Sequence, residues 1–398
     1  MNKKFLVTIL PLILFNIIGL SACSNNQLSY QAKATPSAKE PTNNTVAIKL
    51  KSLQTISSIS PDLAKHKVVF VGESHTNYAN HLNQLAIIKS LQKHWGRKLS
   101  LGLEMVQQPF QSYLDDYVGG KITEREMLIG TQWYERWVYD FRLYRPIFDY
   151  AKKNKIPLIA LNIPKELTKR ITKVGINGLN KKERQQLPAF IDRSNTQYAK
   201  RIKKVFGGHM RTSSKGFEKF FDAQLAWDEG MAFNATKYLK KHPTQHMVIL
   251  AGGGHVIGRE GIPSRLDRQN HSSSAVVLNN ISTTLSAYQG DYLLDSNEAK
   301  LPPAGLMGIF MDNTETGVVV KGLSRSGAAK KSGVKKGDII VALNNSLIQT
   351  SNDIKLWGLD KKPHDPVVLK VKRKNKEYTY RFLLKAPAKK PMHGLKHP

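Results

Sequence analysis

Two histidines in this sequence follow short apolar segments at the same spacing. His75 follows the apolar run 68–71, and His255 follows the apolar run 247–251, each as the last residue of a Gly-x-x-His motif. Glycine lets the backbone approach a ligand closely and turn with positive φ. The free N–H groups of the second motif could hold a carboxylate or phosphate. A histidine at one strand end is commonly structural, but two in matching motifs favour a functional site.

Carboxylate and amide side chains occur at comparable points. Glu104 follows the apolar run 99–103, Asn162 follows the run 156–161, and Glu73 lies two residues before His75. Imidazole and carboxylate groups serve acid–base catalysis, and together they also form divalent metal sites. These residues therefore predict either chemistry, provided that the fold brings them together.

Three helical segments add candidate ligand groups. His81 lies three residues before Gln84, on one face of the helix expected after the first motif. Asp228 lies in an apolar helical stretch, where it needs a partner if it is buried and none if it is solvated. Tyr144 and Arg145, near two tryptophans, suit a flat apolar ligand with carboxylates. They suit a helix core with a surface arginine equally well.

The apolar runs alternate with segments of helical periodicity, which indicates how these groups are positioned. Continuous apolar strands separated by helices predict an α/β fold, with a mostly parallel sheet flanked by helices. Ligands bind beyond the carboxyl ends of the strands in such sheets. We therefore expect the histidines and carboxylates at one edge of the sheet.

The N-terminus predicts export and lipid anchoring. Lys3 and Lys4 precede the apolar stretch 5–20, which is shorter than the ~20 residues of a membrane-spanning helix and is typical of a signal peptide. The stretch ends in Leu20-Ser21-Ala22-Cys23, which resembles a lipobox, so Cys23 is the predicted acylation site and the membrane a predicted partner. Ser24 favours the periplasmic face of an outer membrane. The alternative is an ordinary signal peptide followed by a free cysteine.

Composition narrows the classes of function. The 398 residues hold 61 Lys+Arg and 30 Asp+Glu, a formal net charge of +31, with one cysteine and 40% hydrophobic residues. This composition excludes wholesale disorder, an intramolecular disulfide and a thiolate zinc site. The charge predicts an anionic partner, namely an acidic envelope surface or a small anionic ligand, unless it is a compositional bias. Diffuse charge without a nucleic-acid-binding motif, on an exported chain, argues against nucleic acid.

A second domain is predicted near the C-terminus. Gly327-Ala328-Ala329, followed by Gly337-Asp338-Ile339-Ile340, resembles a PDZ domain over residues 304–385. The resemblance implies that Leu306-Met307-Gly308-Ile309 forms the loop whose amides bind the C-terminal carboxylate of a peptide or protein partner, with the peptide added to the adjacent strand. A purely structural or intramolecular role is the alternative.

The expected domain order follows from these features. It runs from a signal peptide (1–22) and a flexible tether (23–48) through an α/β domain (49–284) and a linker (285–303) to a PDZ domain (304–385) and a basic tail (386–398).

A family resemblance covers roughly residues 60–270. It rests on these motifs in order: Gly72-Glu73-Ser74-His75 with His81 and Gln84, Gly102-Leu103-Glu104-Met105, Leu143-Tyr144-Arg145-Pro146, Leu161-Asn162-Ile163-Pro164, Gln224 to Ala232, and Gly252 to Val256 followed by Gly261-Ile262-Pro263. The chain resembles the ChaN-like haem-binding uptake lipoproteins. The resemblance implies an outer-membrane protein that binds haem or a related iron ligand. Thr76 and Ile257 depart from the family pattern.

The resemblance also implies a ligand pocket. Its residues are Glu73, His75, His81, Glu104, Tyr144, Arg145, Asn162, His209, Asp228 and His255. The same superfamily includes Tiki-like proteases and erythromycin-esterase-like hydrolases. For this alternative, a metal-dependent hydrolase or peptidase, the metal and catalytic roles would fall on His75, Glu104 and His255. The oligomeric state is open between a monomer and a homodimer.

Overall fold

The computed structural model describes residues 48–207, 214–279 and 285–387. Residues Lys49–Pro398 form a compact unit that is separate from Met1–Ile48. The predicted signal peptide, Cys23, His209 and all but the start of the basic tail lie outside the described residues. No helix in the described ranges is long and apolar enough to cross a membrane.

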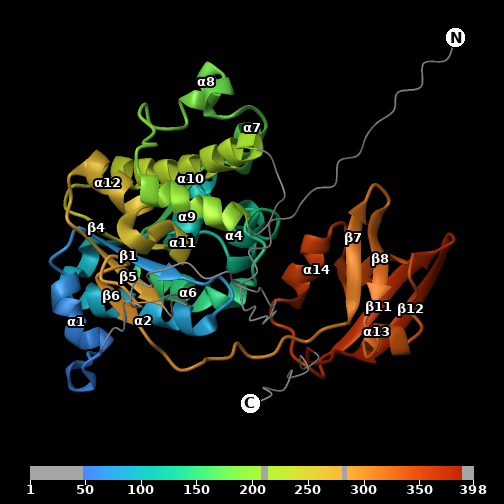
Figure 1. The fold of residues 1–398 in the computed structure, drawn as a ribbon. Helices are drawn as coiled ribbons and strands as arrows, with labels where there is room; N and C mark the ends of the chain where they lie inside the picture. Colours follow the sequence, from blue (N-terminus) through green and yellow to red (C-terminus); the bar gives the residue numbers. More distant parts are fainter. Residues whose placement is uncertain (1–47, 208–213, 280–284, 388–398) are drawn as a thin grey trace, which may run out of the picture. The chain divides into compact units, whose positions relative to one another are not determined.

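A six-stranded parallel sheet forms the centre of the N-terminal domain (Figure 1), which confirms the predicted fold class. Its strands are β1 (Val68–Glu73), β2 (Leu99–Gln107), β3 (Leu158–Asn162), β4 (His246–Gly252), β5 (Ser274–Asn279) and β6 (Tyr292–Leu294). They are ordered β3-β2-β4-β1-β5-β6. The two strands that precede the Gly-x-x-His motifs, β1 and β4, are therefore neighbours.

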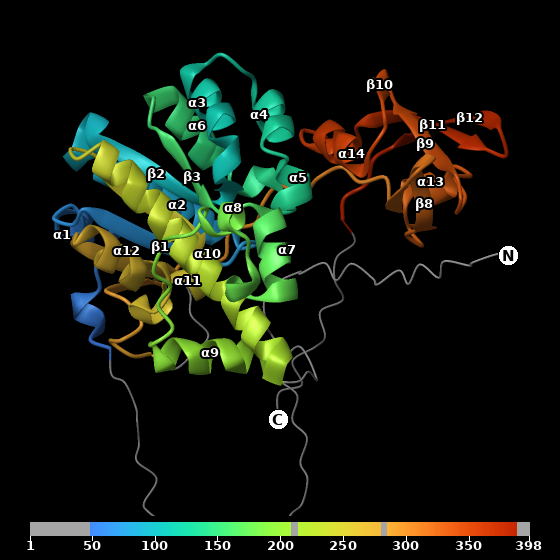
Figure 2. The same ribbon diagram turned by 90° about the horizontal axis from the view of Figure 1, so that it is seen from above.

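Helices cover both faces of this sheet because alternate strand residues point to opposite sides. Val69 and Val71 pack into one core, with helices α1 (Ile56–Leu63), α2 (Tyr78–Trp95), α3 (Gln111–Gly119), α4 (Glu124–Gly130) and α6 (Arg145–Asn154). Val68 and Phe70 pack into the other core, with α10 (Ser214–Lys241), α11 (Gly253–Val256) and α12 (Ile262–Asn270). Figures 1 and 2 show α2 and α6 on one side of the sheet and α10 and α12 on the other.

A third apolar cluster holds shorter helices against α10. Ile171, Tyr198 and Phe221 are buried in it, from α7 (Lys165–Val174), α9 (Thr196–Gly207) and α10. The remaining helices of this domain are α5 (Trp133–Arg136), α8 (Lys181–Arg184), and the 3-10 turns Leu50–Ser52, Gly96–Lys98, Gln108–Phe110, Phe141–Leu143, Ile176–Gly178 and Ile257–Arg259.

The C-terminal region forms a separate antiparallel sheet, ordered β12-β11-β9-β8-β7, with β10 paired to β9. Its elements are β7 (Ile309–Thr314), β8 (Gly317–Leu323), β9 (Ile339–Leu343), β10 (Ser346–Leu347), β11 (Pro366–Arg373), β12 (Lys376–Leu383), α13 (Ala328–Lys331) and α14 (Ser351–Gly358). β7 is an edge strand, and α14 packs beside it.

Several element boundaries differ from the sequence-based expectations. The second strand continues past residue 103 to Gln107, and the third begins only at Leu158, after Pro157, which has no N–H for a sheet ladder. Helix α6 begins at Arg145, with a proline in its first turn. Tyr292–Leu294 pairs with β5, so the sheet extends into the segment predicted as a linker (285–303).

Candidate functional site

The sheet register brings the polar strand ends together. Glu73 of β1 lies directly opposite Gly252 of β4. On the other side of β4, the last pair with β2 is Leu103 opposite Leu250. Glu104 follows directly after this pair. The carboxyl ends of three adjacent strands therefore place Glu73, Glu104 and Gly252 at one edge, as the sequence predicts.

His75 is held by a carboxylate from its own strand. Its Nδ1 lies 2.6 Å from Oε1 of Glu73, and its side chain is 10% exposed. The ring centre lies 4.8 Å from the rings of both Trp137 and Tyr139. Since Nδ1 is engaged, Nε2 is the ring nitrogen left for a ligand or a proton. It forms no hydrogen bond with any residue that the structure describes.

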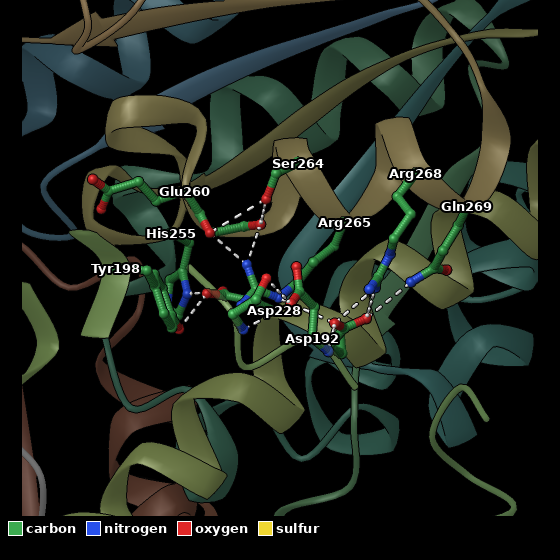
Figure 3. A network of polar contacts seen from close by, with 12 residues as sticks. Asp192, Tyr198, Asp228, His255, Glu260, Ser264, Arg265, Arg268 and Gln269 are labelled. Carbon is green, nitrogen blue, oxygen red and sulfur yellow. Dashed lines mark hydrogen bonds and ion pairs between the residues drawn. The ribbon is translucent and has the colours of Figure 1, made fainter. Parts of the chain in front are cut away.

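His255 is held by the buried aspartate of α10. Its Nδ1 lies 2.5 Å from Oδ1 of Asp228, and its Nε2 lies 3.3 Å from Oε1 of Glu104. The Tyr198 hydroxyl donates a hydrogen bond of 2.6 Å to Oδ2 of Asp228. Figure 3 shows this series from Tyr198 of α9 to His255. Asp228 is 1% exposed, so the partners that its burial requires are present.

Glu104 and His75 converge on Gly252. The amide of Gly252 donates a 2.6 Å hydrogen bond to Oε2 of Glu104, and Asn162 donates a 2.9 Å bond to the Glu104 carbonyl oxygen. A Cβ at Gly252 would lie 2.9 Å from Cε1 of His75 and 3.6 Å from Oε2 of Glu104. Glycine is therefore required where the two side chains meet.

The histidines and carboxylates of this site shift one another's pKa values. Burial opposes charging of His255, but the carboxylates of Glu104 and Asp228 raise its pKa well above the usual value. Burial likewise opposes charging of His75, and Glu73 and Glu104 raise its pKa. Burial alone would raise the pKa of Glu104, yet the two histidines and the Gly252 amide lower it to about 2. The neighbouring carboxylates therefore favour the charged form of the His255 imidazole, against the effect of its burial.

Two known protein families match different parts of this chain. The profile of the family "Haem-binding uptake, Tiki superfamily, ChaN" matches residues 59–266, and a PDZ profile matches residues 305–383. The chain belongs to the ChaN-like haem-binding uptake family. It carries a ChaN-like domain and a PDZ domain, as the sequence motifs predict.

Solved structures and a curated protein show partial similarity. The structure "Cofacial heme binding to ChaN of Campylobacter jejuni" is 19% identical, covering 59% of this chain and 89% of that chain, with a TM-score of 0.49. The HtrA3 PDZ domain bound to a phage-derived ligand is 22% identical, covering 20% and 85%, with a TM-score of 0.19. Protein RETICULATA-RELATED 5, chloroplastic, of Arabidopsis thaliana is 26% identical over 133 residues, or 31% of this chain and 17% of that protein. The chain thus spans less than a fifth of the curated relative.

Two of the predicted pocket residues support the backbone of the ChaN-like site. Nε2 of His81 lies 3.2 Å from the carbonyl oxygen of His75, and its Nδ1 lies 3.1 Å from Oε1 of Gln84. The Tyr144 ring lies 4.3 Å from the His81 ring, and its hydroxyl reaches the same His75 carbonyl at 3.5 Å. Both side chains are at most 1% exposed. They fix the loop that carries His75.

The structure does not bring Arg145 to the His75–His255 cluster. Its guanidinium donates to both carboxylate oxygens of Glu124, at 2.8 and 2.7 Å, on α4. A bidentate ion pair of this kind fixes the side chain in place. His209, the remaining predicted residue, lies outside the described residues.

The predicted divalent metal finds no preformed site within the described ranges. No group of three or more His, Cys, Asp or Glu residues there is arranged to hold a metal ion. Nε2 of His255 and Oε1 of Glu104 contact each other instead.

Two site residues escape prediction from the sequence. Tyr139 lies two residues after Trp137, and its place in an aromatic-rich segment is an available signal. Tyr198 gives no such signal, because it reaches Asp228 only through the packing of α9 against α10. Two buried acceptor atoms at this edge, Oε2 of Glu73 and Oδ1 of Asn162, have no hydrogen-bond partner among the residues that the structure describes.

Proposed function

We propose that this chain is an exported haem-binding lipoprotein, in which the ChaN-like domain binds haem and the PDZ domain recruits peptide or protein C-termini. The observation that carries the haem proposal is the state of His75. Its Nδ1 is engaged by Glu73 at 2.6 Å, its Nε2 is free of hydrogen bonds to described residues, and two aromatic rings flank it. Family membership over residues 59–266 supports the same conclusion.

The residues at His75 fit a haem group. Haem iron accepts an axial histidine nitrogen, and a carboxylate on the other ring nitrogen orients the imidazole and makes it a stronger ligand. Trp137 and Tyr139 offer apolar ring surface beside His75, which suits a flat macrocycle. When bound, haem would supply an iron centre for ligation by His75.

Haem binding can be measured on the chain beginning at residue 24, because Lys49–Pro398 forms a compact unit separate from the first 48 residues. We expect hemin to give a Soret shift that saturates at a fixed stoichiometry. A Soret spectrum identical to that of free hemin throughout the titration would overturn the proposal.

The PDZ domain offers a peptide site at the predicted loop. The carbonyls of Met307 and Gly308 accept hydrogen bonds from the amides of Ala329 and Ser324, at 3.0 and 2.8 Å. The amides of Met307 and Gly308 form no bond with a described residue and are available for a carboxylate. The adjacent edge strand β7, which packs beside α14, would then pair with the peptide.

Membrane attachment belongs to the same proposal. Acylation at Cys23 and outer-membrane localisation follow from the signal peptide and lipobox pattern of the sequence. Replacing Cys23 with serine should move the protein from the membrane fraction to the soluble envelope fraction. Retention of the Cys23→Ser protein in the outer membrane would contradict lipid anchoring. Homodimerisation stays a prediction, which sedimentation of the chain with and without hemin tests.

One structural observation supports the alternative that the chain is a hydrolase. A histidine whose Nδ1 is fixed by Glu73 and whose Nε2 forms no hydrogen bond with a described residue has the arrangement of a general base, and the Glu104 carboxylate also lies beside Gly252. Metal analysis separates the two functions. Stoichiometric metal that is lost on His75→Ala favours the hydrolase, whereas a purified protein without metal that binds hemin favours haem uptake.

A further inference from the structure

A hollow of about 540 Å³ lies in the ChaN-like domain, and none of the histidine-site residues lines it. One face of α10 forms a wall of the hollow, because Phe233, Thr236, Lys237 and Lys240 have the i, i+3, i+4, i+7 spacing of a single helical stripe. The end of α12 and the segment between α8 and α9 complete the lining. Its volume lies within the range of small-molecule sites, about 300–1,000 Å³.

The rim of the hollow exposes an aromatic ring. Phe190 is 63% exposed, and the Arg268 guanidinium lies 4.7 Å from the centre of its ring. Pro188 and Phe233 add apolar surface to the same hollow. A ligand that covers apolar surface of this kind removes it from water, and this burial stabilises the complex.

Cationic groups surround this apolar surface. Lys237 and Lys240 form no ion pair with a described residue, and no acidic side chain lines the hollow. Arg268 pairs with Glu229 through Nη2 at 2.7 Å, as part of the network in Figure 3. Lysines near a helix C-terminus also offset the helix dipole, but that role does not require an apolar hollow between them.

We propose that this hollow binds an amphiphilic anion, a molecule with an acyl or aryl body and one carboxylate or phosphate head. The body packs between Phe190 and Phe233, and the head is neutralised by Lys237 and Lys240. The site is distinct from His75 and does not depend on haem binding. Its ligand is either a free amphiphile or the headgroup and upper chain of an anionic membrane lipid, which share this chemistry.

Binding is tested on the chain from residue 24 with two soluble probes, 8-anilinonaphthalene-1-sulfonate by fluorescence and decanoate by calorimetry and by competition. We expect saturable binding of the dye that decanoate displaces. The double variant Lys237→Ala/Lys240→Ala should lower the affinity for both probes at least tenfold. Phe190→Ser should lower it about fivefold. The matched controls are Lys203→Ala/Lys204→Ala on α9, which removes the same charge, and Tyr288→Ser, which removes an exposed ring.

The source of the ligand is decided by flotation with vesicles of phosphatidylglycerol and phosphatidylcholine. Decanoate binding without flotation assigns the hollow to a free amphiphile. Flotation that is lost in the Lys237→Ala/Lys240→Ala variant, without decanoate binding, assigns it to a membrane lipid. Equal binding of dye, decanoate and vesicles by the variant, its matched control and the parent chain would overturn the proposal. All these variants change exposed side chains, and circular dichroism checks that each remains folded.

Discussion

The imidazole of His255 is bound to the Asp228 carboxylate through Nδ1 at 2.5 Å, in a site where the aspartate is 1% exposed. His75 repeats this relationship with Glu73 at 2.6 Å. Both histidines are thus fixed through Nδ1 by a carboxylate, and Nε2 of His255 lies 3.3 Å from Oε1 of Glu104. Carboxylate partners of this kind set the tautomer and orientation of a functional imidazole.

Asp228→Asn should lower the pKa of His255. The substitution keeps the shape of the side chain and removes one of the two carboxylates that hold His255 in its charged form. We expect a fall of at least about one unit, since close opposite charges shift pKa values by about 1–3 units. Imidazole chemical shifts followed against pH by NMR measure it. Asp267→Asn, at an aspartate paired with Arg259, is the control, and an unchanged His255 pKa in Asp228→Asn would refute the coupling.

Glu104 should make folding sensitive to acid. Its pKa falls from 4.5 to about 2, so it contributes stability that is present above about pH 4.5 and is lost as the pH drops toward 2. Each unit corresponds to about 1.4 kcal/mol, which gives a loss on the order of 3 kcal/mol. His255 acts in the opposite sense, because its raised pKa contributes stability below about pH 6.5 that is lost as the pH rises through the raised value. The contributions of Glu104 and His255 to stability are therefore both present between about pH 4.5 and 6.5.

Urea unfolding from pH 7 to 2.5 measures this dependence. Glu104→Gln should lack the Glu104 part of the acid loss, while Glu298→Gln, at an exposed residue, should behave like the parent chain. Identical slopes of unfolding free energy against pH in the parent and Glu104→Gln would show that the carboxylate is not stabilised by the histidines.

Gly252→Ala should disturb the ligand site without unfolding the domain. The new Cβ would lie 2.9 Å from Cε1 and 3.3 Å from Nε2 of His75, so that the imidazole must move. We expect hemin affinity to fall at least about tenfold, because displacing a ligand atom by a fraction of an ångström is costly at a preorganised site. Gly254→Ala is the matched control, since a Cβ there meets no atom within 4 Å. Equal affinities for the two variants would argue against a ligand at His75.

The sheet and most of the ligand edge are predictable from the sequence, for a physical reason. Buried parallel strands are apolar along their whole length, so the polar residues that follow them mark the strand ends. This rule locates the sheet edge at Glu73 and His255, whereas Glu104 lies inside β2, directly after its last residue paired with β4. The ion pair of Arg145 with Glu124 could not be predicted from the sequence, because it depends on how α4 packs. Tyr198 escapes prediction for the same kind of reason, since its contact joins two helices rather than neighbouring residues.

Gly308→Ala should weaken peptide binding by the PDZ domain. Gly308 has φ of +77°, and a Cβ there would lie 2.6 Å from Cα of Gly327. Both effects distort the loop that presents the free amides. A fluorescent peptide with a free apolar C-terminal residue should bind the parent chain and lose at least about tenfold in affinity to the variant. The same peptide with an amidated C-terminus should not bind either protein.

The control for the loop is Gly254→Ala in the ChaN-like domain, where a Cβ meets no atom within 4 Å. It should bind the peptide like the parent chain. Peptide affinity that survives Gly308→Ala would place any peptide site of this domain elsewhere than the Leu306–Ile309 loop.

Iron ligation by His75 is the central claim, and hemin titration of three matched proteins tests it most directly. The parent chain, His75→Ala and His94→Ala are compared at one pH by Soret absorbance, His94 being an exposed histidine at the far end of α2. The account predicts that His94→Ala binds hemin with the parent spectrum and affinity. It predicts that His75→Ala loses the Soret shift or binds at least about tenfold more weakly. A parent-like spectrum and affinity in His75→Ala would contradict it.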